Sequence, residues 1–218
     1  MRIGIEINGV LRNTIEKITQ VYQKNNIDGY QSEFMGNQTY KLDMSGNTEE
    51  EVLPEPFKYE MSLPVTSLTL TDHFKFQSEE EYYSFLYEEH PMEIFGHSPS
   101  TEMTTFIDIN SIYVNLRNLH DFVIVSDEIG KSKPASLFFL SKFGCEFEKV
   151  KFYSNTTINS MWDEIDVLLT ANPHLLLNHP SDKTIIKFET EYNKTISNPY
   201  TINKIKELGE ILNILNLC

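Results

Sequence analysis

The sequence predicts an α/β protein with a doubly wound parallel sheet. Short apolar runs suited to buried strands alternate with stretches in which apolar residues recur every three or four positions, as in amphipathic helices. Strands that alternate with helices form βαβ units, and helices then cover both faces of the parallel sheet. The chain has 218 residues, 40% of them hydrophobic, which is enough to bury such a core.

The first 25 residues predict a strand, a turn and a helix. Isoleucines alternate with other residues over 2–8, and Gly9 ends this run at a turn. Apolar residues then recur at helical spacing, which predicts a helix over 11–25 (Leu11, Ile15, Ile18, Val21 and Tyr22).

Residues 27–104 have a different composition, being polar, acidic and rich in turn residues. One strand is expected at 67–70, and Ser78 is a suitable N-cap for a short helix. We interpret 27–104 as an inserted, cap-like lobe between two parts of the core, 1–26 and 105–218. The aromatic residues between 82 and 87 are expected either to pack on the core or to form the face that contacts a partner or a second copy.

The regular alternation returns after this lobe. Strands are expected at 122–126, 150–153, 166–170 and 185–188, separated by helices over 108–119, from about 132 to Gly144, around 158–162, and over 202–215 near the C-terminus.

Charge and composition exclude several classes of protein. The chain carries 32 acidic and 18 basic residues, a net charge of -14, so general binding to nucleic acid or to an anionic membrane is not expected. No apolar run reaches the roughly 18–20 residues that span a bilayer, and the N-terminus has no signal-peptide pattern. Two cysteines in a chain of this length are typical of a reduced, cytoplasmic protein. The six histidines are scattered, which argues against a zinc site.

Polar residues follow three of the predicted strands: Glu6 to Leu11, Ser126, and Thr170 to Pro173. In open parallel sheets, function is found at these carboxyl ends. The order and spacing of the three stretches resemble the haloacid dehalogenase-like (HAD) superfamily, most closely its 5'(3')-deoxyribonucleotidase branch. In that branch the first strand ends in D-x-D-G-V-L, the second in Ser or Thr, and a later one in D-V-L-I-D-D-R-P. Asp166 to Pro173 matches the last motif in length and frame, and Glu191-Tyr192-Asn193 resembles a further P-Y-N segment.

The resemblance implies a magnesium-dependent phosphatase whose catalytic residues this chain has largely replaced. Glu6 and Asn8 stand where the family has its nucleophilic aspartate and its acid/base aspartate, and Thr170 and Ala171 replace the Asp-Asp pair that helps to hold magnesium. The family lysine has no counterpart in 154–162, and only Ser126 is retained. Asparagine cannot exchange a proton near neutral pH, and one glutamate with neutral oxygens is a weak magnesium site.

We therefore expect no catalytic residues, no metal and no cofactor, and interpret the chain as a non-catalytic HAD-like protein that acts as a structural or interaction subunit. A protein partner or self-association is expected, with a cytoplasmic location, or a virion if the chain is phage-encoded, as nucleotidases of this length often are. Two alternatives stay open. One is an active magnesium-dependent phosphatase or 5'-nucleotidase, and the other is a phosphate- or nucleotide-binding module without turnover.

Two further groups of residues were considered for the site. Lys131 and Lys133, near the start of a helix and beside Ser126, are candidates for holding an anion. Asp127 and Glu128 directly follow Ser126 and could replace the lost acids, although a solvent-exposed loop position is the expectation for both.

Overall fold

The computed structural model describes residues 1–25, 74 and 76–216. Six strands form one parallel sheet in the order β3-β2-β1-β4-β5-β6. The strands are β1 (Arg2–Glu6), β2 (Asp121–Asp127), β3 (Val150–Tyr153), β4 (Val167–Thr170), β5 (Thr184–Phe188) and β6 (Thr201–Ile202). The helical elements are α1 (Thr14–Gln23), α3 (Glu79–Ser84), η3 (Phe85–Glu89), η4 (Met92–Gly96), α4 (Thr105–Leu116), α5 (Ser132–Lys142), α6 (Ile158–Trp162), α7 (Pro173–Leu177), η5 (Ile205–Glu207) and α8 (Leu208–Asn216). The predicted fold class is confirmed.

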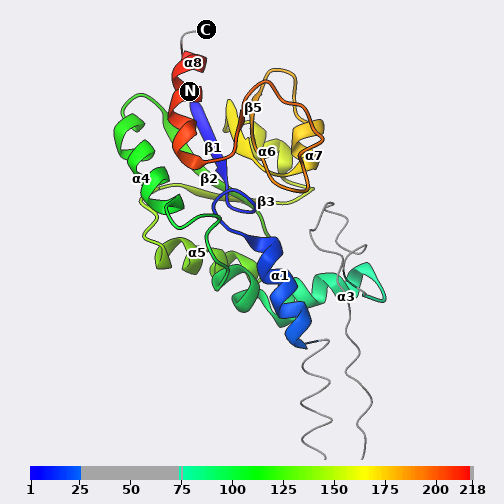
Figure 1. The fold of residues 1–218 in the computed structure, drawn as a ribbon. Coiled ribbons are helices and arrows are strands. Elements are labelled where there is room, and N and C mark those ends of the chain that lie inside the picture. The colour runs from blue at the N-terminus through cyan, green and yellow to red at the C-terminus, as the bar shows by residue number, and fades with distance from the viewer. Residues whose placement is uncertain (26–73, 75, 217–218) are drawn as a thin grey trace, which may run out of the picture.

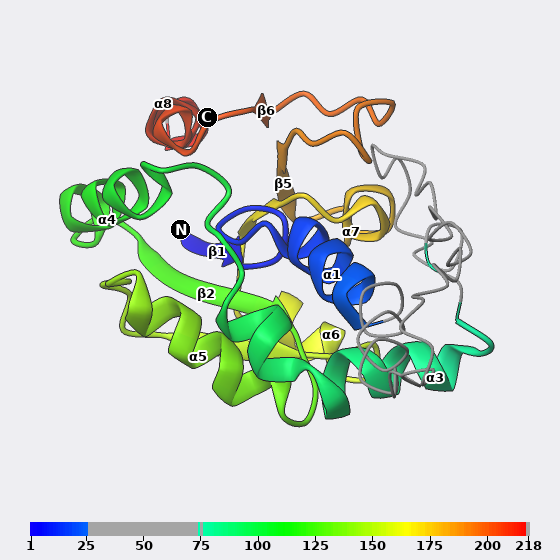
Figure 2. The ribbon, with the colours of Figure 1, turned by 60° about the horizontal axis from the view of Figure 1, so that its bottom comes forward.

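Helices cover both faces of the sheet, as expected for strands that are apolar on both sides. On one face Ile3 and Ile5 of β1, and Ile7 just after it, pack with residues of α4, α5 and α8, and Figure 2 shows α4 and α8 side by side on that face. On the other face strand residues pack with Met161 and Trp162 of α6 and with Leu175 and Leu176 of α7. The sheet is therefore the middle layer of three.

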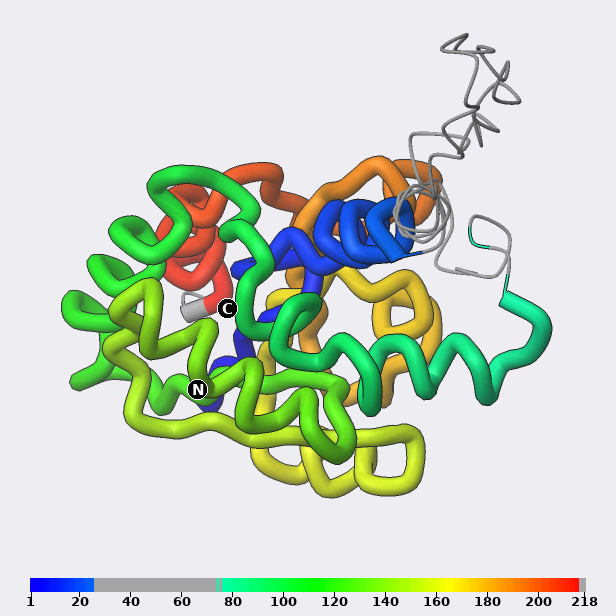
Figure 3. Tube along the Cα trace, turned by 90° about the horizontal axis from the view of Figure 1, so that it is seen from below, coloured from blue at the N-terminus to red at the C-terminus, as the bar shows by residue number. Residues whose placement is uncertain are grey.

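The carboxyl ends of the strands point toward α1 and the segment 76–96, whereas the N-terminus and α8 lie at the opposite end (Figure 1). A third apolar cluster joins α1 to this segment and to Ala135 of α5, through side chains that include Tyr22, Phe85 and Phe95. Figure 3 shows the segment as a helical arm beside α5, with α3 extending away from the body. The segment 76–96 therefore lies near the carboxyl ends of the strands.

The inserted segment agrees with the sequence where the structure describes it. The Ser78 side chain accepts a hydrogen bond from the Glu81 amide at 3.2 Å and caps α3. Phe85 is buried and Tyr82 is partly buried, while Tyr83 is exposed. The strand expected at 67–70 lies outside the described residues, and the proposed boundaries of the lobe stay a prediction.

Three local features differ from the sequence-based expectation. The first helix begins at Thr14, not at Leu11, because the Ile7 carbonyl accepts hydrogen bonds from the amides of Leu11 and Arg12 and so closes a turn. α4 spans Thr105–Leu116, a few residues earlier than expected. The short elements β6 and α7 were not predicted. Across the described residues, no helix is both long enough and apolar enough to cross a membrane.

Candidate functional site

Glu6 is a buried carboxylate at the carboxyl end of β1, a central strand of the sheet. It is 1% exposed, and it lies at the point where the strand order reverses, with β2 and β3 on one side and β4 on the other. In such sheets this switch point is where ligands bind. Glu6 faces the α6 and α7 side of the sheet, because Ile3, Ile5 and Ile7 alternate with it and face α4, α5 and α8.

Two hydroxyl groups hold the Glu6 carboxylate from neighbouring strands. Tyr153, at the end of β3, donates to Oε1 at 2.7 Å, and Thr170, at the end of β4, donates to Oε2. The amide of Asn172 in turn donates to the Thr170 hydroxyl at 2.9 Å. Tyr153 and Thr170 are both buried, so the carboxylate has a fixed orientation.

The environment of Glu6 changes its acidity. Burial raises its pKa to about 7, and the charge of Asp127 adds to this rise, whereas the hydrogen bonds from Thr170 and Tyr153 oppose it. Desolvation disfavours the charged form of a carboxyl group, and hydroxyl donors favour it. Glu6 is therefore a carboxyl group that changes its protonation near neutral pH.

Asp127 is the second acidic group on this face of the sheet. It ends β2, is paired in register with Tyr153, and its pKa is raised by burial and by the charge of Glu128. A carboxyl group can donate and accept a proton, which the Asn8 amide cannot do. Asp127 is therefore the acid/base candidate on the same face of the sheet as Glu6.

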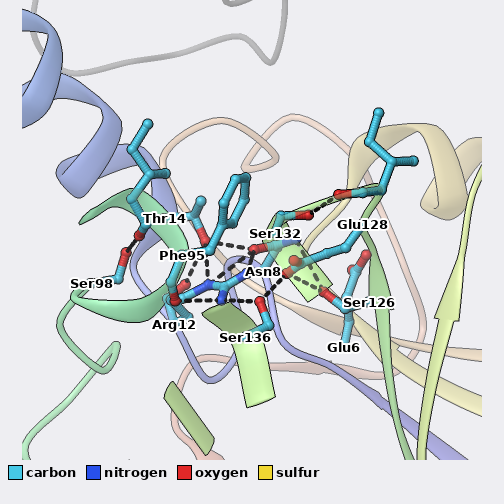
Figure 4. A network of polar contacts seen from close by, with 12 residues as sticks. Glu6, Asn8, Arg12, Thr14, Phe95, Ser98, Ser126, Glu128, Ser132 and Ser136 are labelled. Atoms are coloured by element: carbon cyan, nitrogen blue, oxygen red, sulfur yellow. Dashed lines mark hydrogen bonds and ion pairs between the residues drawn. The ribbon is translucent and has the colours of Figure 1, made fainter. Parts of the chain in front are cut away.

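Asn8, Arg12, Ser126 and Glu128 form a ring of polar contacts on the other side of the turn after β1 (Figure 4). Asn8 Nδ2 donates to Ser126 Oγ at 3.3 Å, and Ser126 Oγ donates to Glu128 Oε1 at 3.1 Å. Arg12 Nη2 donates to Glu128 Oε1 at 2.5 Å and to Asn8 Oδ1 at 2.6 Å. Glu128 is 1% exposed, so the expectation that it is a solvent-exposed loop residue is wrong.

The structure brings Glu6, Asn8, Ser126 and Thr170 to one edge of the sheet but does not gather the candidate anion-binding residues in the same way. The buried hydroxyl of Ser126 is engaged with Asn8 and Glu128. Lys131 pairs with Glu88 at 2.7 Å on the surface, and the Lys133 amine lies 6.0 Å from the centre of the Phe152 ring. These three residues have separate sets of partners, and their role with an anion stays a prediction.

The segment 191–193, singled out by its resemblance to P-Y-N, borders the site from beyond β5. Asn193 is fully buried and donates to the carbonyls of Ala171 and Phe188, both at 2.9 Å. The Tyr192 hydroxyl lies over Gly9, where an added Cβ would be 2.2 Å from it, and Gly9 has a φ of 77°. Only glycine suits this turn, since both the space and the backbone conformation exclude a side chain.

The donor set does not fit the magnesium site of the resembled family. Within the described ranges, no group of three or more His, Cys, Asp or Glu side chains is placed to hold a metal ion. Both oxygens of Glu6 accept hydroxyl hydrogen bonds. Thr170 supplies one neutral oxygen and Ala171 supplies none where the family has two carboxylates, and hard divalent cations prefer charged oxygen ligands.

Comparison with known proteins shows the fold. No protein-family model and no curated protein matches the sequence. A solved structure described as a haloacid dehalogenase-like hydrolase, from Burkholderia xenovorans, aligns with 100% of this chain and 98% of its own, with a TM-score of 0.54 and 12% identity. A haloacid dehalogenase-like family hydrolase from Xanthomonas campestris covers 100% of this chain and 96% of its own, with a TM-score of 0.48 and 10% identity. The chain has the α/β fold of HAD-like hydrolases.

This comparison overturns the expectation of a non-catalytic structural or interaction subunit. The Burkholderia protein, which shares the fold over its full length, is described as a hydrolase. The phosphatase alternative agrees with that finding better than the subunit interpretation does. The expectation gave too much weight to the missing motif residues, and it set Asp127 and Glu128 aside as solvent-exposed loop residues, whereas Asp127 ends β2 and Glu128 is buried.

Proposed function

We propose that the chain is a phosphate-monoester hydrolase in which the Glu6 carboxylate is the nucleophile and Asp127 is the general acid/base. The observation that carries this proposal is the position of Glu6, a buried carboxylate fixed by Tyr153 and Thr170 at the switch point of a HAD-like sheet. The family nucleophile occupies the same place at the end of the first strand. A fixed orientation favours attack, because misplacement by about 1 Å can cost 100-fold in rate.

The reaction balances with these two groups. A Glu6 oxygen attacks phosphorus while the bond to the ester oxygen breaks, and the departing alkoxide takes the proton of Asp127. Water then attacks the phosphorus of the acyl phosphate, gives its proton to Asp127, and releases phosphate and the Glu6 carboxylate. The raised pKa of Asp127 suits it to both transfers. No step in this scheme is assigned to a metal ion, because the donor set does not fit one.

Nucleoside monophosphates are the substrate class that the resemblance to the nucleotidase branch favours. Asp166 to Pro173 forms β4 and the first residue of α7, as the resembled motif would require of a strand that ends at the site. Glu6 is 1% exposed, so a substrate reaches it only when side chains at this edge move. We therefore expect slow turnover.

The test is a screen for phosphate release from p-nitrophenyl phosphate and nucleoside monophosphates, with and without millimolar magnesium. The variant Glu6→Gln keeps the size of the side chain and removes the nucleophile, so turnover should fall by about 10³-fold or more. Glu16→Gln, at an exposed position in α1, should retain full turnover. Mass spectrometry of the quenched reaction should find one phosphoryl group on the peptide that contains Glu6.

The proposal fails if the wild-type protein releases phosphate no faster than Glu6→Gln. Nucleotide binding without turnover would support the alternative of a binding module, and would exclude Glu6 as a nucleophile. Turnover that requires added magnesium would retain the hydrolase and overturn the metal-free scheme.

A further inference from the structure

We infer that Arg12 and Glu128 form a built-in cation–carboxylate pair that orders the ends of β1 and β2, so that the site keeps its geometry without a divalent metal ion. The inference concerns the site of the proposed function, but its readouts do not require turnover. It rests on the burial of the pair, on the number of its contacts, and on the residues that those contacts fix.

The pair is fully removed from solvent. The Arg12 and Glu128 side chains are both 0% exposed, and Nη2 lies 2.5 Å from Oε1. A buried ion pair loses the hydration of both charges, and further hydrogen bonds offset this loss. Glu128 Oε1 accepts such bonds from Ser126 and Ser136, whereas Oε2 has no hydrogen-bond partner within the described residues. The other described arginine–carboxylate pair, Arg2–Asp166, is more than 40% exposed on both sides, so the burial of Arg12 is not a general property of arginines in this chain.

Every nitrogen of the Arg12 guanidinium donates at least one hydrogen bond. Its flat, forked geometry can direct five N–H groups to separate acceptors, which an ammonium group cannot do. Its acceptors come from four different parts of the chain: Asn8 Oδ1, Thr14 Oγ1, Glu128 Oε1, Ser136 Oγ and the carbonyl of Phe95. The ring centres of Phe95 and Phe139 lie 5.0 and 5.2 Å from the central carbon, Cζ, of the guanidinium.

The pair fixes the two polar residues that stand at family motif positions. Asn8 Oδ1 accepts from Arg12 at 2.6 Å and from Thr14 at 2.7 Å, which leaves the Asn8 amino group directed at Ser126. The Ser126 hydroxyl in turn donates a hydrogen bond to Glu128 Oε1. The ring Arg12–Asn8–Ser126–Glu128 thereby holds the turn after β1 against the end of β2.

In a site ordered by a metal ion, the cation binds the strand ends together through their carboxylates. Here the positive charge is the Arg12 guanidinium, which belongs to the chain itself. It also donates hydrogen bonds to the Phe95 carbonyl in η4 and to the Ser136 hydroxyl in α5. An asparagine at position 8 is consistent with this arrangement. An aspartate there would compete with Glu128 for the same guanidinium.

The experiment separates ordering of the site from simple stability. Arg12→Met alone leaves the Glu128 charge buried and unpaired, so Tm should fall by roughly 6–20 °C. The double variant Arg12→Met with Glu128→Leu removes both charges, and its Tm should return to within a few degrees of wild type. Hydrogen exchange of the amides in 8–13 should nevertheless be more than about 10-fold faster in the double variant than in wild type. The control Arg2→Met with Asp166→Leu should leave exchange in 8–13 unchanged.

Two outcomes would overturn the inference. Unchanged exchange in the double variant would mean that backbone hydrogen bonds alone order the turn. A rise of Tm on adding magnesium to wild type, absent in Glu6→Gln, would mean that a metal ion orders this edge, since only a ligand that binds the folded state raises Tm. If phosphate release is never found while the exchange results hold, the proposed function fails and this inference stands.

Discussion

At the scale of single residues, the protonation of Glu6 links the stability of the fold to pH. Its pKa rises from an ordinary 4.5 to about 7 on folding, so the folded state holds the proton more tightly than the unfolded state does. Stability from this group is fully present below pH 4.5 and is lost as pH rises through about 7, by about 3 kcal/mol in all. Glu6→Gln cannot titrate, so its free energy of unfolding should lack this loss.

The measurement is urea denaturation of both proteins across this pH range. The wild-type value minus the Glu6→Gln value should fall between acid and neutral pH. A difference that stays constant would mean that folding leaves the pKa of Glu6 unchanged, and a difference that grows with pH would mean that folding lowers it.

Asp127 offers a second test at this scale. Asp127→Asn removes the proposed acid, and turnover of a nucleoside monophosphate should fall by about 10²–10⁴-fold. The pre-steady-state burst of p-nitrophenolate, which reports only the transfer of the phosphoryl group to Glu6, should slow much less, because p-nitrophenolate leaves without protonation. A burst that slows as much as nucleotide turnover would assign Asp127 a role other than protonating the leaving group. Rapid-quench kinetics with both esters decide this.

The sequence predicted the site only in part, for reasons that concern individual side chains. Glu6, Ser126 and Thr170 could be placed at one edge because each follows an apolar strand. Tyr153 could not be found, since a tyrosine at the end of a strand is ordinarily a core residue. Arg12 appeared to be a polar residue of a helix, because its burial depends on Glu128, Ser136 and Phe95, all more than 80 positions away.

At the scale of elements, Asn193 holds the end of β4 to the end of β5. Its amide group donates to Ala171 and Phe188, and its oxygen accepts from the Thr190 amide at 2.9 Å. Asn193→Ala leaves two buried carbonyls and one amide without these partners, so the free energy of unfolding should fall by about 2–4 kcal/mol. Urea denaturation measures the change, and the exposed Asn203→Ala serves as the control. Similar values for both variants would contradict a structural role for Asn193.

The elements were predictable where hydrophobic pattern alone decides them. The apolar residues of β1 to β5 either alternate with other residues or form short runs, as in buried strands, and the five are strands in the structure. β6 has only Thr201 and Ile202 and is defined by its pairing with β5, which a local pattern does not reveal. The start of α1 was predicted three residues early because the turn 7–12 depends on carbonyl acceptors, not on hydrophobicity.

At the scale of the whole molecule, the net charge of -14 opposes compaction. Like charges spread over one surface repel each other in the folded state more than in the expanded chain. Salt screens this repulsion, with a Debye length of about 10 Å at 0.1 M and 3 Å at 1 M. We expect Tm to rise as sodium chloride is added from low to moderate concentration, as measured by calorimetry. A falling Tm would mean that attractive ion pairs dominate the surface instead.

The interdependence of Arg12 and Glu128 also limits how this sequence can change over time. A substitution at either position leaves a charge buried without its partner, whereas replacing both together should cost little stability. Single changes should therefore be purged by selection, and the two positions should vary together across descendants of this chain. In a lineage that replaced both residues one at a time, the intermediate would have been less stable, and position 8 would then be free to carry an aspartate.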